Sequence, residues 1–142
     1  MIKNIQKNYE ELFKHSCYAF CLCYKFSDTK NEWVWLEYIA KGVQNGYITE
    51  DCYVEKPVLF INSILDSSEY AKNYKKDVAK VTINSIADIP NEPTIVEMEC
   101  PTGGSHFVVC HYDGNKVVLD FDPSGVSNSW VAQKFISWRK YL

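Results

Sequence analysis

The segment HSCYAFCLCY places three cysteines, Cys17, Cys21 and Cys23, within seven positions. Three thiols this close together could bind zinc, form a redox pair, fill a hydrophobic core or include a nucleophile. Structural zinc sites usually combine two pairs of ligands, each pair two to four residues apart. The spacing here is C-x3-C-x-C without a second pair, since Cys100 and Cys110 stand singly, and the chain has no C-x-x-C motif. The spacing therefore predicts neither a metal site nor a cofactor.

Cys17 differs from the other two cysteines because it is expected to begin a helix. Ser16 is a suitable N-cap, and residues 17–26 are apolar nearly all round, which predicts a buried helix. The helix dipole and the free N–H groups at a helix start favour a thiolate. Cys21 and Cys23 lie further along the helix and are expected to fill the core. A nucleophilic cysteine also needs a base, normally a histidine that a third group orients.

Two of the three histidines lie in a predicted β-hairpin, in which HFVVCHY and KVVLDFD flank the turn residues DGN. A three-residue loop pairs Tyr112 with Lys116 and gives the hairpin one apolar face. In that register His106 lies directly across from Asp122, with Cβ atoms about 5 Å apart. Such a pair can be an ordinary cross-strand ion pair, or the carboxylate can orient the imidazole for proton transfer.

The remaining histidines fit other roles. In the predicted register His111 lies on the apolar face as a core or edge residue, and Asp120 is a solvated charge on the other face. His15, two positions before Cys17, is expected at the surface near the helix start. His106 is therefore the imidazole best placed to serve as a base for Cys17.

The elements that must position these residues change character midway along the chain. The first half has helical periodicity, and the second half has short β-branched segments separated by turns. Helices are expected at 2–13, 17–26, 32–46 and 57–72, and strands at 80–86, 94–100, 106–112 and 116–122, with a short helix or a last strand in 127–142. Helices followed by an antiparallel sheet are typical of the α+β class.

The size and charge of the chain narrow its class. Its 142 residues suit one domain, with a helical half at about 1–75 and a sheet half at about 76–142. The net charge is −3 and no basic run stands out, so nucleic-acid binding is not predicted. No apolar run approaches the ~20 residues that span a bilayer, so no membrane partner is expected.

The N-terminal residues lack the apolar region of a secretory signal, so we expect a cytoplasmic protein with reduced cysteines.

Two short motifs resemble those of a known family. Ser16-Cys17-Tyr18-Ala19-Phe20 is similar to the G-S-C-W-A-F sequence around the nucleophile of papain-like cysteine peptidases. His106-Phe107-Val108-Val109 and Asp122-Pro123 resemble the bacteriocin leader peptidase domains of bacterial exporters, which have an H-[FY]-V-V-V strand, a turn and a second strand ending in Asp-Pro. The resemblance follows the order of elements over residues 5–138, and its specific motifs cover about twenty residues.

The resemblance implies a papain-like fold, with N-terminal helices packed on a C-terminal antiparallel sheet in a single domain over 1–142. It also implies that Cys17 is the nucleophile, His106 the general base and later the acid, and Asp122 the group that holds the imidazole. The implied substrate is a peptide or protein, and no cofactor is required.

The chain departs from that family at two positions. Glu11 stands where the family has a Gln whose amide completes the oxyanion hole, and a carboxylate there would repel the developing charge. Tyr18 replaces the Gly that follows the nucleophile in the exporter domains. Three functions therefore stay open: a thiol hydrolase of peptide or isopeptide bonds, a papain-fold binding protein for a peptide or protein, and an amidase or acyltransferase with the same triad.

Overall fold

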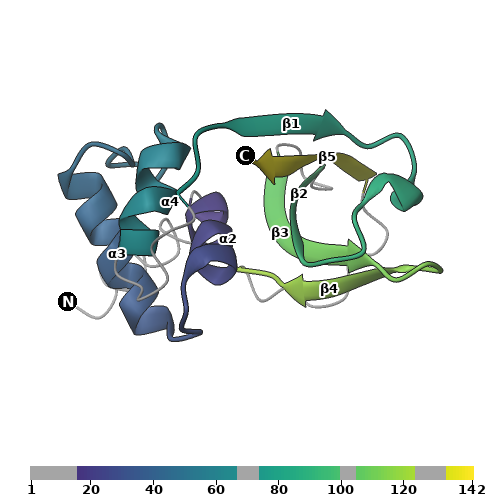
Figure 1. Ribbon diagram of the computed structural model, residues 1–142, viewed down its shortest axis with the longest axis horizontal. Coiled ribbons are helices and arrows are strands. Elements are labelled where there is room, and N and C mark those ends of the chain that lie inside the picture. Colours follow the sequence, from purple (N-terminus) through teal and green to yellow (C-terminus); the bar gives the residue numbers. More distant parts are fainter. Residues whose placement is uncertain (1–15, 67–73, 100–104, 124–133) are drawn as a thin grey trace, which may run out of the picture.

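A computed structural model describes residues 16–66, 74–99, 105–123 and 134–142 of the chain. In Figure 1 the described α-helices lie together at one end of the molecule and the strands at the other. The described elements are helices α2 (Cys17–Phe26), α3 (Glu32–Gln44) and α4 (Pro57–Asp66), the 3-10 helix η1 (Ile86–Asp88), and strands β1 (Val78–Thr82), β2 (Thr94–Glu99), β3 (Ser105–Tyr112), β4 (Val117–Phe121) and β5 (Lys134–Tyr141). The predicted α+β class is confirmed. The helix expected at 2–13 and the end of the one expected at 57–72 lie outside the described residues.

The strands form one antiparallel sheet in the order β1-β5-β2-β3-β4. The last segment of the chain, expected as a helix or a strand, is therefore a strand, and it lies between β1 and β2. The strand predicted at 80–86 ends earlier, at Thr82, because Ser85 and Asp88 form a capping box that begins η1. In Figure 1 the sheet curves, and its two edge strands, β1 and β4, lie at the top and bottom of the view.

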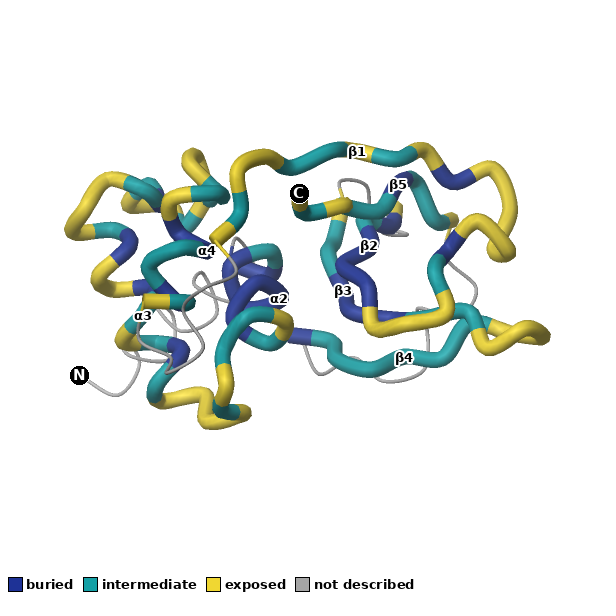
Figure 2. The backbone as a smooth tube through the Cα atoms, viewed as in Figure 1, coloured by how far each residue is buried: buried dark blue, intermediate teal, exposed yellow. Residues whose placement is uncertain are grey.

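Helix α2 lies at the centre of the molecule. It contacts α3 and α4 and also β2 and β3, and Figure 2 shows buried positions concentrated along it and in the central strands. Ala19 and Leu22 are fully buried. A helix that is apolar nearly all round can bury its side chains only when other elements pack on several of its faces. The apolar residues between 17 and 26 therefore require both the other helices and the sheet to pack against α2.

Strands β2 and β3 are buried on both faces. Ile95 pairs with Val109 on the face that packs against the helices. Val96 pairs with Val108, and both belong to a second apolar cluster on the opposite face. Since successive side chains in a strand point to opposite faces, burial on both faces requires the nearly continuous apolar runs seen in these two strands.

The β3–β4 hairpin has a shorter turn than predicted. Tyr112 pairs with Val117 and not with Lys116. The Asp113 carboxylate accepts hydrogen bonds from the N–H groups of Asn115 and Lys116, both at 2.8 Å. The Asp113 N–H group also donates to the Lys116 carbonyl oxygen at 3.0 Å, which leaves only Gly114 and Asn115 in the turn, so the predicted three-residue loop is wrong.

A bulge in β4 changes the register a second time. Val109 pairs with Phe121, whereas Cys110 pairs with Leu119, so Asp120 is an extra residue in β4. Phe121 packs on the helix-facing side with Val109, as predicted. Leu119, predicted on that same side, packs on the opposite one with Cys110. The bulge therefore divides the apolar residues of β4 between the two cores.

Gly42 provides a test of how α3 packs. A Cβ atom on residue 42 would lie 2.8 Å from Ile48 Cδ1 and 3.0 Å from Phe60 Cδ2, both on buried side chains. We expect Gly42→Ala to lower the free energy of unfolding by about 1–3 kcal/mol, since overpacking outweighs the better helix propensity of alanine. Urea denaturation measures this change, and Lys41→Ala, an exposed position of the same helix, is the control. A stabilised Gly42→Ala variant would contradict the close contact.

Candidate active site

Cys17 is the first residue of α2. It lies at the seam, the region where α2 packs against strands β2 and β3. Ser16 precedes it as predicted, but its side chain makes no capping hydrogen bond. The helix begins with the bond from Phe20 N–H to the Ser16 carbonyl oxygen, 3.0 Å long. Cys17 is 8% exposed, whereas Cys21 and Cys23 are both 0% exposed. All three cysteines are buried, but among them only Cys17 retains any exposed surface.

Cys21 and Cys23 occupy the core, as expected for small hydrophobes. Burial raises the pKa of the Cys23 thiol, and burial together with the nearby Cys17, Asp122, Cys110 and Cys23 raises the pKa of the Cys21 thiol. Both thiols therefore stay protonated at neutral pH. A protonated, enclosed thiol is neither a nucleophile nor a metal ligand.

His106 and Asp122 lie side by side at the other side of the seam. His106 Nε2 is 2.8 Å from Asp122 Oδ1, and their side chains are 16% and 5% exposed. Because Val109 pairs with Phe121, Asp122 falls opposite Val108 and meets His106 diagonally. The prediction that Asp122 lies directly across from His106 is therefore wrong by two residues, but the expected contact forms because a shift of two keeps the same face.

The imidazole of His106 also reaches Cys17. Burial alone lowers the pKa of His106, but hydrogen bonds to Asp122 and to Cys17, and the charges of these two groups, outweigh burial and raise the pKa to about 9. Because Nε2 bonds Asp122, Nδ1 is the nitrogen left for Cys17. The structure thus brings together the three predicted site residues, with a protonated imidazole between a sulfur and a carboxylate at neutral pH.

This arrangement can carry out nucleophilic chemistry on a carbonyl. A thiol beside an imidazole can be activated as a nucleophile by proton transfer to the ring, and the carboxylate fixes the ring in one orientation. The described residues hold no group of three or more His, Cys, Asp or Glu side chains placed to bind a metal ion.

The other residues weighed as site candidates lie elsewhere. His111 Nδ1 is 2.8 Å from Asp120 Oδ2, and the two side chains are 24% and 17% exposed. The expectation that His111 and Asp120 lie on opposite faces of the hairpin is wrong, because the bulge at Asp120 lets the two side chains meet. His15 and Glu11 lie outside the described residues.

Two residues that the sequence analysis did not assign to the site lie beside it. Tyr18 follows Cys17, Phe107 follows His106, and their ring centroids are 4.7 Å apart. In the sequence, Tyr18 stands out only as a departure from the pattern of the exporter peptidase domains, and Phe107 only as an apolar strand residue. Their place next to the two reactive side chains was a usable signal, but the contact between them depends on how α2 docks on β3.

No family model, curated protein or solved structure matches this chain. Among the helices that the structure describes, none is long and apolar enough to cross a membrane.

The contact between Asp122 and His106 predicts a measurable titration. A carboxylate next to an imidazole favours its charged form, so Asp122→Asn should lower the pKa of His106 from about 9 toward its ordinary value of 6.5. NMR titration of the His106 ring measures this shift. Asp120→Asn makes the same chemical change in the neighbouring ion pair and should leave the His106 midpoint in place. A wild-type midpoint near 6.5 would contradict the geometry.

The different positions of the clustered thiols predict different costs of substitution. Cys21→Ser buries a hydroxyl in an apolar core and should lower the free energy of unfolding by about 1–3 kcal/mol. Cys17→Ala removes one atom at the helix start and should cost less than about 1 kcal/mol. Urea denaturation compares the two variants. A loss of several kcal/mol in Cys17→Ala would make Cys17 a core residue instead of a site residue.

Proposed function

We propose that this protein is a papain-like cysteine peptidase, or a closely related thiol hydrolase, which cleaves a peptide or isopeptide bond. Cys17 is the nucleophile, His106 the general base and acid, and Asp122 the group that holds the imidazole. The observation that carries the proposal is that one imidazole bonds both a thiol at a helix start and a buried carboxylate.

The reaction begins with the Cys17 thiolate attacking the carbonyl carbon of the bond. The N–H group of Cys17, at the start of α2, can donate a hydrogen bond to the developing oxyanion. His106 gives its proton to the leaving amine, and the acyl group stays on Cys17 as a thioester. His106 then takes a proton from water, whose oxygen attacks the thioester, and the acid product leaves with the thiolate and imidazolium restored.

Three features support the papain-like assignment over another thiol enzyme. The nucleophile begins a buried helix, the base lies on an antiparallel strand against which this helix packs, and the residues follow the order Cys, His, Asp. We extend the assignment to a single domain over residues 1–142, to a peptide or protein substrate and to a cytoplasmic location.

The proposal predicts a set of activity losses. A peptide-library screen should yield a substrate that the wild-type protein cleaves, and Cys17→Ala should abolish the cleavage. His106→Ala should lower kcat by about 10²–10⁴, the usual contribution of general acid–base catalysis. Cys52→Ala, which changes a partly exposed thiol outside the seam, is the matched control and should keep full activity.

The same screen separates the alternatives. Cleavage of muropeptides, with no cleavage of ordinary peptides, would assign the site to a cell-wall amidase. Binding of a peptide without any turnover, with equal affinity in wild type and Cys17→Ala, would make the protein a binding module and overturn the proposed hydrolase.

A further inference from the structure

The residues that follow the two reactive side chains contact each other. Tyr18 follows Cys17 in α2, and Phe107 follows His106 in β3. Their rings lie 4.7 Å apart at an interplanar angle of 33°, which is an attractive aromatic geometry. Any sliding of α2 along β3 must separate or compress these rings. The ring contact therefore sets how far the start of α2 lies from the start of β3.

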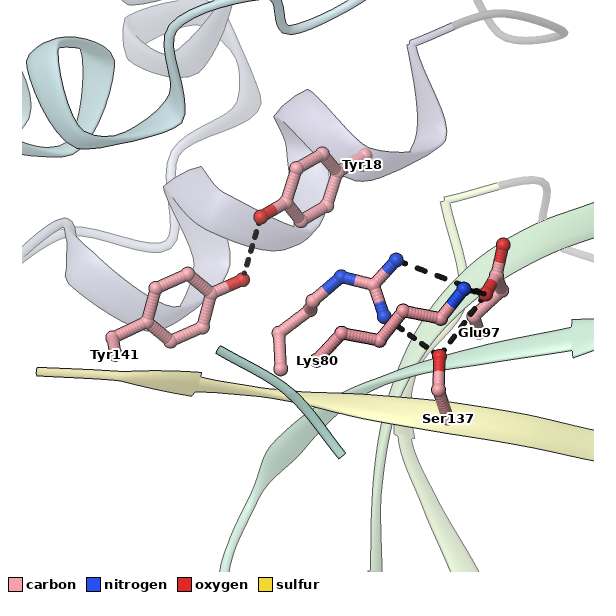
Figure 3. Close-up of polar contacts among 6 residues, drawn as sticks. Tyr18, Lys80, Glu97, Ser137 and Tyr141 are labelled. Carbon is pink, nitrogen blue, oxygen red and sulfur yellow. Dashed lines mark hydrogen bonds and ion pairs between the residues drawn. The ribbon is translucent and has the colours of Figure 1, made fainter. Parts of the chain in front are cut away.

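Strand β5 supplies one partner for each ring. The Tyr18 hydroxyl lies 3.0 Å from the Tyr141 hydroxyl, and Figure 3 shows the two hydroxyls pointing toward each other. The Arg139 guanidinium lies over the Phe107 ring, with Cζ 5.2 Å from the centroid. Arg139 and Tyr141 are two positions apart in β5, so both project from the sheet face that meets α2.

Arg139 is itself held in place. Its Nη1 donates to the Ser137 hydroxyl at 2.6 Å, and this hydroxyl donates to Glu97 Oε1 at 3.0 Å. Arg139 Nη2 lies 3.7 Å from the same Glu97 oxygen, and Lys80 Nζ lies 3.8 Å from it. Ser137 is fully buried, and the Arg139 and Glu97 side chains are each only 15% exposed. Figure 3 shows Lys80 and Ser137 converging on the Glu97 carboxylate.

We propose that Arg139 and Tyr141 are positioning residues: from β5 they hold the Phe107 and Tyr18 rings together, and thereby keep His106 within hydrogen-bonding distance of Cys17. Neither residue touches the reacting atoms. The inference rests on the proposed function, since it concerns the same Cys17–His106 pair.

The reactive pair needs such an external constraint. Cys17 and His106 belong to elements far apart in the sequence, and a displacement of about 1 Å between reacting groups can cost on the order of a hundredfold in rate. A hydrogen bond between two side chains does not fix the backbones that carry them. Burial raises the pKa of Tyr18 and of Tyr141, so both hydroxyls keep their protons at neutral pH and the bond between them persists there.

Alkylation of Cys17 by iodoacetamide tests the proposal without a known substrate. The rate is followed by peptide mass spectrometry from about pH 5 to 10, because a thiol reacts with iodoacetamide as its thiolate and the rate therefore depends on pH. His106→Ala defines the profile of a Cys17 that lacks its partner. We expect Arg139→Gln to lower the rate at about pH 6 roughly tenfold and to move the profile toward that of His106→Ala. Tyr141→Phe, which removes one oxygen, should move it in the same direction by a smaller amount.

Lys80→Gln is the matched control for Arg139→Gln. This substitution removes one positive charge next to the Glu97 carboxylate, as Arg139→Gln does. The Lys80 side chain, however, is 59% exposed. Its alkylation profile should equal that of wild type, and circular dichroism verifies that each variant is folded. If Arg139→Gln does not fold, Tyr141→Phe alone decides.

The outcomes distinguish this inference from the function on which it rests. If wild type and His106→Ala give the same profile, the Cys17–His106 pair does not form as proposed, and both the function and the inference fail. If wild type differs from His106→Ala, but Arg139→Gln and Tyr141→Phe match wild type, the proposed function stands and the positioning role is overturned. An equal change in Lys80→Gln would also overturn it, since charge loss alone would then explain the effect.

Discussion

The two hydrogen bonds of the His106 imidazole are the interaction on which the rest of the molecule depends. The ring is 16% exposed, and its contacts with Asp122 and Cys17 outweigh burial and raise its pKa to about 9. A buried cation is costly unless both of its donors find acceptors. One acceptor, Asp122, comes from the end of the hairpin, and the other, Cys17, comes from the start of α2. The imidazole is therefore satisfied only when the helix, β3 and β4 are all in place.

The three clustered cysteines illustrate how position along one helix decides the chemistry of identical side chains. Cys21 and Cys23 lie within α2, where protein surrounds them and burial raises the pKa of both thiols. Cys17 is the first residue of the helix, and it retains a small exposed fraction of 8%. The run from Ala19 to Cys23 is buried throughout, which anchors the middle of α2 in the core. The same apolar sequence that fixes the helix thus leaves Cys17, at its start, as the clustered cysteine that contacts His106.

The sequence predicted the local elements well and the long-range ones poorly. Apolar residues all round and a polar residue before them predicted α2 at Cys17–Phe26, which is where it lies. The contact of His106 with Asp122 was expected from a register that is wrong in detail. The backbone bond from Asp113 to Lys116 closes a shorter turn and Asp120 adds a bulge, and together they shift the pairing by two residues. A register shift of two residues leaves each side chain on the same face of the hairpin, so His106 and Asp122 still contact each other.

Strand β5 was beyond the reach of sequence reasoning because nothing local specifies its place between β1 and β2. Its register against β2 also shifts, so that Phe135 pairs with Met98 but Ser137 with Glu97, and the alternation along the strand is broken. No pattern in this segment indicates that Arg139 would meet Phe107.

The polar contacts of β5 also bear on why such residues lie in the seam at all. Replacing a buried ion pair with apolar side chains of similar volume is often neutral or stabilising, so stability alone does not require Arg139 and Glu97 there. Apolar contacts are non-directional, and an apolar seam could slide without a large change in energy. Hydrogen bonds and the guanidinium–ring contact are directional and tolerate only one arrangement of Tyr18 and Phe107. We infer that these directional contacts serve to hold the proposed nucleophile, Cys17, and the proposed base, His106, at a fixed distance, and not to add stability.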